Sequence, residues 1–218
     1  MATQTKENYL KALYYLNQKS DEISVTDLGK MMQVSKPTVN NMVKRLEAEG
    51  WVKYEKYKPL KITNLGKKTA AIIVRRHRLS EMFLSQEMGF GWEEVHDIAE
   101  EMEHITSQAL FDRMDEILGY PNQDPHGSPI PDKDGNFDKP NYKPLSHFTK
   151  GEFILKALQE SSSEFLNFLN KKQIGLDTTI ELENVEEFDK SMIVNYANNK
   201  NVTLSQAVCN KLLVKQKV

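Results

Sequence analysis

The chain has 218 residues, 39% hydrophobic and 28% charged, which is an ordinary balance for a soluble globular protein. No apolar run approaches the roughly 20 residues that cross a bilayer, and the first residues lack a signal-peptide core, so we expect a cytoplasmic protein. The single cysteine excludes an internal disulfide, and the net charge of −2 combines a formal +9 over residues 1–78 with a formal −11 over residues 79–218.

The first 50 residues predict three helices. Apolar residues spaced three and four apart place these helices from Lys6 to about Gln18, from Ser24 to about Met32 and from Ser35 to Glu49. The stretch Ser24-Val25-Thr26-Asp27 resembles a capping box. Ser35 is a good N-cap with Pro37 in the first turn, and Gly50 suits the position that follows a helix.

Residues 51–62 predict a short basic hairpin that turns near Tyr57 to Pro59. Two helices, a polar-faced third helix and a basic hairpin form the pattern of a winged helix-turn-helix, whose third helix enters the major groove of DNA. There Thr and Asn reach base edges, and lysines neutralise phosphates. The predicted DNA-binding residues are Ser35, Lys36, Pro37, Thr38, Asn40, Asn41, Lys44, Lys56 and Lys58. A small bundle that binds protein is the alternative, which the positive charge disfavours.

Two longer helices are predicted next, from about Asn64 to Met88 and from about Trp92 to Leu118. On the second, one face within an arc of about 100° would carry His96, Glu100, Glu103 and His104. His77 and Glu81 repeat the four-residue spacing on the first. Imidazoles and carboxylates on one face are ligands for a divalent metal of intermediate hardness. Two long, partly apolar helices also suggest a dimer with two recognition helices at palindromic half-sites.

The acidic helix face has other interpretations. It can be a solvated surface with incidental histidines, the metal centre of a hydrolase that activates water, or part of a regulator that answers an organic ligand. A hydrolase needs an open coordination position beside a substrate cleft. The sequence shows no Gly-rich phosphate loop and no nucleophile elbow, so we do not expect an enzyme.

The last 100 residues differ from the preceding helical regions in composition and in predicted secondary structure. A Pro-, Gly- and Asp-rich loop covers residues 119–146, and short strands with one short helix at 160–171 follow, which suggests a small β-barrel. The predicted strands lie at 153–157, 178–182, 192–196 and 212–214. The expected fold is mainly α with a small β module. Its three domains are a winged helix-turn-helix at 1–70, a helical dimerisation and metal-binding domain at 71–143 and the β-barrel at 144–218.

Five segments in this order carry a resemblance to a known family. They are Glu7-Asn8-Tyr9-Leu10, Val34-Ser35-Lys36-Pro37-Thr38-Val39, Arg75-Arg76-His77-Arg78-Leu79-Ser80-Glu81, residues 96–104 and Pro125-His126-Gly127-Ser128-Pro129-Ile130-Pro131. Together they resemble the diphtheria-toxin-repressor/manganese-transport-regulator family of metal-activated repressors, and the C-terminal module resembles the FeoA-like barrel of its longer members. The resemblance implies a homodimer that binds an operator in double-stranded DNA and represses metal-uptake genes when metal is plentiful.

The resemblance also implies two metal sites. His77, Glu81 and His96 match one site, and the best candidate for a further ligand from the C-terminal module is Glu164, with Glu160 second. Glu100, Glu103 and His104 match the other site, together with Asn8 on the first helix. Some manganese regulators instead build a second site from the loop, an arrangement that Asp124 and His126 with Glu81 would serve.

The residue types at these positions favour a particular metal. Glu100 and Asn8 stand where iron-type members place Cys and Met, so oxygen replaces soft sulfur and favours Mn²⁺, with Fe²⁺ as the alternative. Lys11 stands where short manganese-type members have a metal-binding Glu. Without metal, we expect the carboxylates to repel one another and the first helix to be free of the fifth. With metal, we expect Asn8 to be tied to Glu103 and its neighbours.

Overall fold

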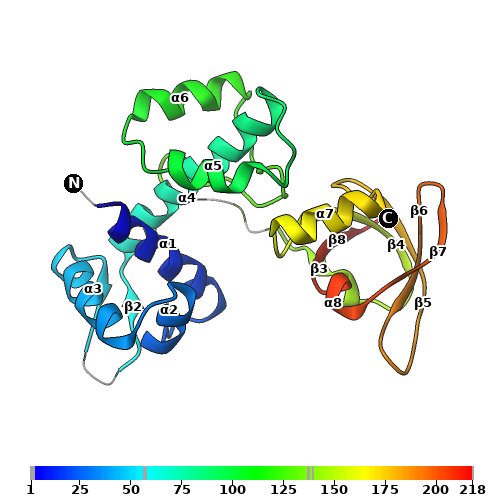
Figure 1. The fold of residues 1–218 in the computed structure, drawn as a ribbon, viewed down its shortest axis with the longest axis horizontal. Coiled ribbons are helices and arrows are strands. Elements are labelled where there is room, and N and C mark those ends of the chain that lie inside the picture. Colours follow the sequence, from blue (N-terminus) through cyan, green and yellow to red (C-terminus); the bar gives the residue numbers. More distant parts are fainter. Residues whose placement is uncertain (1–2, 56–57, 137, 139, 218) are drawn as a thin grey trace. The chain divides into compact units, whose positions relative to one another are not determined.

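The computed structural model describes residues 3–55, 58–136, 138 and 140–217, which divide into two compact units (Figure 1). Unit 1 comprises residues 1–80, 99–120 and 130–137, and unit 2 comprises residues 81–98, 121–129 and 138–218. Among the described residues, no helix is long and apolar enough to cross a membrane.

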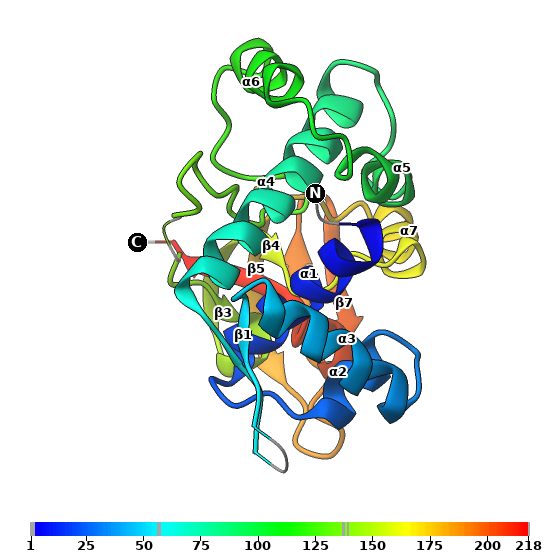
Figure 2. The ribbon, with the colours of Figure 1, turned by 90° about the vertical axis from the view of Figure 1, so that its left-hand side faces the viewer.

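The N-terminal part of unit 1 is a three-helix bundle with a hairpin beside it, as both ribbon views show (Figures 1 and 2). Its elements are α1 (Gln4–Lys19), α2 (Val25–Met31), α3 (Lys36–Ala48), β1 (Val52–Lys53) and β2 (Lys61–Ile62). The Ser24 hydroxyl accepts from the Asp27 backbone N–H at 2.9 Å, which caps α2, and Ser35 caps α3. Burying Leu10, Leu28 and Val43 together holds the bundle. The predicted winged helix-turn-helix architecture is confirmed.

The region that follows contains three helices rather than two. They are α4 (Asn64–Gln86), α5 (Val95–Met102) and α6 (Gln108–Ile117). The single helix predicted from Trp92 to Leu118 is wrong, because the chain turns after Met102. Ser107 then accepts from the Leu110 backbone N–H at 3.4 Å and caps a new helix. A serine that bonds nearby backbone offers the chain this alternative to continuing the helix.

A buried ion pair fixes α6 and the following loop to α4 within unit 1. Arg75 on α4 donates to the Asp115 carboxylate at 2.5 Å and to the Pro131 carbonyl at 2.7 Å. Both charged side chains are less than 10% exposed. Because both of its guanidinium contacts are to acceptors on other segments, Arg75 joins three parts of the chain at one point.

The C-terminal part of unit 2 is a six-stranded antiparallel sheet in the order β3-β8-β4-β5-β6-β7. The elements are β3 (Lys143–Pro144), the short 3₁₀ helix η1 (Leu145–His147), β4 (Gly151–Leu158), α7 (Ser163–Lys172), β5 (Thr179–Val185), β6 (Met192–Tyr196), β7 (Asn199–Leu204), α8 (Gln206–Cys209) and β8 (Leu212–Gln216). Phe165, Leu166 and Leu169 pack α7 into the apolar core of the sheet. The four predicted strands and the helix are present, while β3, β7, η1 and α8 were not predicted.

Candidate metal centre

Glu103 lies at the centre of a polar cluster that joins α1, α4 and the end of α5 within unit 1. Its side chain is 0% exposed, and its two oxygens lie 2.7 and 2.8 Å from Lys11 Nζ on α1. One of these oxygens also lies 2.8 Å from His77 Nδ1 on α4. The same Lys11 ammonium contacts a Glu100 oxygen at 2.5 Å. A buried carboxylate is stable only when it is paired, and these contacts supply the pairing.

His104 is oriented by the first turn of α1. Its Nδ1 lies 2.6 Å from a Glu7 carboxylate oxygen, and its Nε2 lies 3.8 Å from a Glu103 oxygen. When Nδ1 carries the proton and donates to Glu7, the Nε2 lone pair faces the cluster. Metal-binding histidines are commonly held by a carboxylate in this way. Glu7 belongs to the motif Glu7-Asn8-Tyr9-Leu10, but its role in orienting His104 was not predicted from the sequence.

The donors around Glu103 suit a divalent cation of the manganese type, since all are oxygen or nitrogen. His77, Glu100 and Glu103 each offer a ligand atom within 4.8 Å of the others. The Asn8 side-chain oxygen is buried and has no hydrogen-bond partner among the described residues. Buried acceptors are normally satisfied, so an orphaned oxygen on α1 fits the ligand role proposed for Asn8.

The carboxylates that were expected to repel one another share a lysine as their partner. Lys11 places an ammonium against Glu100 and Glu103, and Glu7 contacts His104, so α1 is joined to the end of α5. Lys11 was predicted only to stand in place of a metal-binding Glu, whereas its positive charge offsets the negative charge of the cluster. The first helix is therefore not free of the fifth in this structure.

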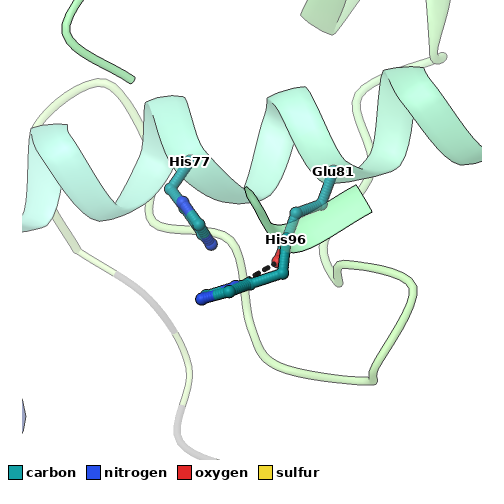
Figure 3. Close-up of side chains that lie close together, drawn as sticks. All are labelled: His77, Glu81 and His96. Carbon is teal, nitrogen blue, oxygen red and sulfur yellow. Dashed lines mark hydrogen bonds and ion pairs between the residues drawn. The ribbon is translucent and has the colours of Figure 1, made fainter. Parts of the chain in front are cut away.

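Glu81 is a second buried carboxylate, on the part of α4 that belongs to unit 2. One of its oxygens lies 3.2 Å from His96 Nδ1, and the other lies 3.8 Å from His126 Nδ1. His77 stands one turn earlier on the same helix, and Figure 3 shows His77, Glu81 and His96 close together. Ligand atoms of these three residues lie within 4.8 Å of one another, as do those of Glu81, Asp124 and His126. The predicted grouping of His96 with His77 and Glu81 is thus present in the structure.

The loop histidine His126 is held with one nitrogen facing Glu81. Its Nε2 lies 2.8 Å from the Trp92 carbonyl and donates to it, which leaves Nδ1 toward the Glu81 carboxylate. Burial lowers the pKa of His126, but the contact with Glu81 and the charge of Asp124 more than offset this, so the pKa is raised above its usual value. A neutral imidazole nitrogen and a carboxylate are both acceptors, so a proton or a metal ion is needed between them.

The loop backbone fixes the position of His126. The Asp124 carboxylate accepts from the backbone N–H groups of His126 and Ser128 at 2.8 and 2.9 Å. Gly127 has φ +83°, and a Cβ there would lie 2.2 Å from the Lys156 carbonyl on β4. Only glycine therefore allows the loop this close approach within unit 2.

The two residues proposed from the C-terminal module do not join these groups in the described part of the chain. Glu164 is exposed in the first turn of α7. Glu160 pairs with Lys211 and accepts from the Ser162 hydroxyl at 2.8 Å, and the bond to Lys211 lowers the pKa of the Glu160 carboxyl. Neither is among the grouped ligands of the described residues.

The predicted DNA-binding residues share the outer side of α3 and the start of this helix. Exposed there are Ser35, Lys36, Pro37, Thr38, Asn41 and Lys44. Asn40 is half-buried, and its side-chain oxygen accepts from the Tyr54 hydroxyl at 3.3 Å, which ties α3 to the hairpin. In the hairpin Lys58 is exposed and pairs with Glu55, while Lys56 lies outside the described residues. These exposed polar side chains leave one face of α3 available to a large partner.

Two family models match this chain. Residues 1–60 match the model described as "Iron dependent repressor, N-terminal DNA binding domain". Residues 63–132 match "Iron dependent repressor, metal binding and dimerisation domain". The polar cluster around Glu103 uses residues from both matched regions, and the group around Glu81 lies within the second.

Named proteins of similar sequence include the iron-dependent repressor IdeR of Mycobacterium leprae, 33% identical over 127 residues that make up 58% of this chain and 55% of that protein. The diphtheria toxin repressor of Corynebacterium diphtheriae is 32% identical over 138 residues, 62% of this chain and 61% of that protein. The matches to these relatives thus span little more than half of their length.

Solved structures resemble the whole chain. A manganese-dependent transcriptional repressor in complex with manganese is 30% identical, with a TM-score of 0.87 over 97% of this chain and 100% of the other. The structure of ScaR with bound Zn²⁺ is 31% identical, with a TM-score of 0.80 over 97% of this chain and 99% of the other. The matched part of this chain includes residues of both units.

Proposed function

Because the chain belongs to the iron-dependent repressor family, we propose that it is a transcriptional repressor whose affinity for operator DNA depends on a bound divalent metal. The observation that carries this proposal is the junction between α1 and the end of α5. Glu7 and Lys11, on a helix of the DNA-binding head, contact His104 and Glu103. The relatives are repressors, so the hydrolase interpretation of the acidic face has no support.

We propose that two groups of residues hold metal. Asn8, Glu100, Glu103 and His104 would hold one ion, and Glu81, Asp124 and His126, with His96 and His77 nearby, would hold another. A bound divalent cation would supply positive charge to the buried carboxylates. Glu7 keeps the His104 Nε2 turned toward the cluster, and the Trp92 carbonyl does the same for the His126 Nδ1.

Manganese is the metal that we propose, with iron(II) as the alternative. The donors in both groups are oxygen and nitrogen, and the single cysteine, Cys209, is buried in the core of the sheet module. Hard donors of this kind suit Mn²⁺, while the Irving–Williams order of affinities alone would favour divalent ions later in the first transition row. One structural relative is a manganese-dependent repressor and one sequence relative is an iron-dependent repressor, so both metals belong in the test.

The proposed DNA contact uses α3 in the major groove and Lys58 of the hairpin on the phosphates, in a homodimer that reads two half-sites. We propose that this repressor controls metal-uptake genes. Binding to an operator selected from random duplex DNA would be measured by fluorescence anisotropy with Mn²⁺, with anaerobic Fe²⁺ and with chelator.

We expect tight binding with metal and weak binding with chelator. Glu103→Ala should lose the response to metal, while Glu101→Ala, at an exposed position on α5, should keep it. Equal affinity with metal and with chelator in the unaltered protein would refute metal dependence.

A further inference from the structure

Lys11 is the one lysine whose ammonium lies within the Glu103 cluster among the residues that the structure describes. It makes three contacts with carboxylate oxygens, at 2.5 Å to Glu100 and at 2.7 and 2.8 Å to Glu103. The contacts to Glu100 and to one Glu103 oxygen are hydrogen bonds, and the contact to the other Glu103 oxygen is a close ion pair. Its side chain is only 10% exposed, which means that the charge lies inside the protein rather than at the surface.

The ammonium and a divalent ion cannot occupy this cluster together. Metal–oxygen bonds to carboxylates are about 2.0–2.2 Å long, so an ion held by Glu100 and Glu103 would stand within a few ångströms of Nζ. Two positive charges at that separation, away from bulk water, repel each other strongly. Both Glu103 oxygens and one Glu100 oxygen, which are candidate ligands of the ion, already contact Lys11. Binding of an ion therefore requires the lysine side chain to leave, and its flexible stem allows the ammonium to reach solvent.

The displacement of Lys11 affects the free energy of metal binding at this cluster. The Lys11–Glu103 and Glu7–His104 pairs themselves hold α1 against the end of α5. A metal thus competes with a tethered cation for the junction, and the cost of breaking the lysine contacts is subtracted from its binding free energy. The metal concentration at which the site fills is set in part by this one side chain.

Resting on the proposed function above, we propose that Lys11 is an internal cation that closes the α1–α5 junction in the metal-free protein and weakens metal binding there by direct competition. The expected occupant after exchange is a divalent cation such as Mn²⁺.

The test is a calorimetric titration of the full chain with Mn²⁺, comparing the unaltered protein with Lys11→Met and Lys11→Gln. The Glu103→Gln variant shows which of the Mn²⁺-binding sites in the titration belongs to this cluster. Lys6→Met is the matched control, because Lys6 lies on the same helix but pairs with Glu49 instead. We expect both Lys11 variants to bind Mn²⁺ at this cluster at least about tenfold more tightly than the unaltered protein, since charged hydrogen bonds no longer need to be broken.

A second measurement covers variants that fold poorly without metal. Thermal unfolding with chelator and with Mn²⁺ should show that Lys11→Met loses stability in chelator and regains more on adding Mn²⁺ than the unaltered protein does. Equal Mn²⁺ affinity in the unaltered protein and both Lys11 variants would overturn the inference, while metal-dependent repression would stand. If the unaltered protein bound no Mn²⁺ or Fe²⁺ in either group, the proposed function would fall, and the inference with it.

Discussion

Replacing Glu103 by Gln tests whether the buried cluster stabilises the metal-free protein. The change removes a charge from a side chain that is 0% exposed and contacts Lys11 at 2.7 and 2.8 Å and His77 at 2.8 Å. Losing one partner of a buried ion pair costs about 3–5 kcal/mol. Gln keeps one acceptor oxygen, and Glu100 still faces the ammonium, so we expect a loss of about 2–3 kcal/mol.

The assay is urea unfolding of the metal-free chain, followed by far-ultraviolet circular dichroism with chelator present. Glu101→Gln, on the exposed side of α5, should change the unfolding free energy by less than about 0.5 kcal/mol. In a double-mutant cycle, Lys11→Met combined with Glu103→Gln should cost clearly less than the sum of the two single changes, because the second change removes a charge already left unpaired. Additive losses, or full stability of Glu103→Gln, would refute the pairing.

Three further predictions concern separate parts of the molecule. Glu81→Gln should weaken Mn²⁺ binding at the group of Glu81, Asp124 and His126 by at least about tenfold in a calorimetric titration. The control Glu87→Gln, at an exposed position, should leave the Mn²⁺ affinity unchanged, and equal affinities of the two variants would contradict the role of Glu81. Lys44→Ala should lower the affinity for all operator sequences and reduce the slope of log affinity against log salt concentration by about one, measured by fluorescence anisotropy at several salt concentrations. An unchanged slope, or an equal effect of Lys190→Ala, would exclude Lys44 from the DNA face. Because burial raises the pKa of the Cys209 thiol to about 12, a thiol reagent at neutral pH should label it only in denaturant, and rapid labelling of the native chain would show that the thiol is accessible.

The local parts of the fold were predictable from the sequence. Ser24 and Ser35 mark the starts of α2 and α3, because each side chain accepts a hydrogen bond from the backbone N–H three residues later. Gly50 follows the end of α3. These signals act over three or four residues, so no tertiary information is needed to find them. The residue types of the candidate ligands were visible for the same reason, since His77 and Glu81 stand one helical turn apart.

The partners of those ligands were not predictable. Lys11 and Glu100 are 89 residues apart, and His104 and Glu7 are 97 apart, so only folding brings them together. The break after α5 was also missed, because the apolar spacing continues through it while Ser107 starts a new helix. The polar edge strand β7 has weak alternation of buried and exposed residues, so its sequence lacks the usual strand pattern.

The early end of α5 gives the cluster its electrostatic setting. The helix stops at Met102, so Glu100, Glu103 and His104 stand at its carboxyl end, where the helix dipole carries partial negative charge. Carboxylates are unfavourable at that end of a helix, and cations are favoured there. The backbone and the side chains therefore both contribute negative potential at the end of this helix. Either a tethered ammonium or a free metal ion at this position offsets that potential.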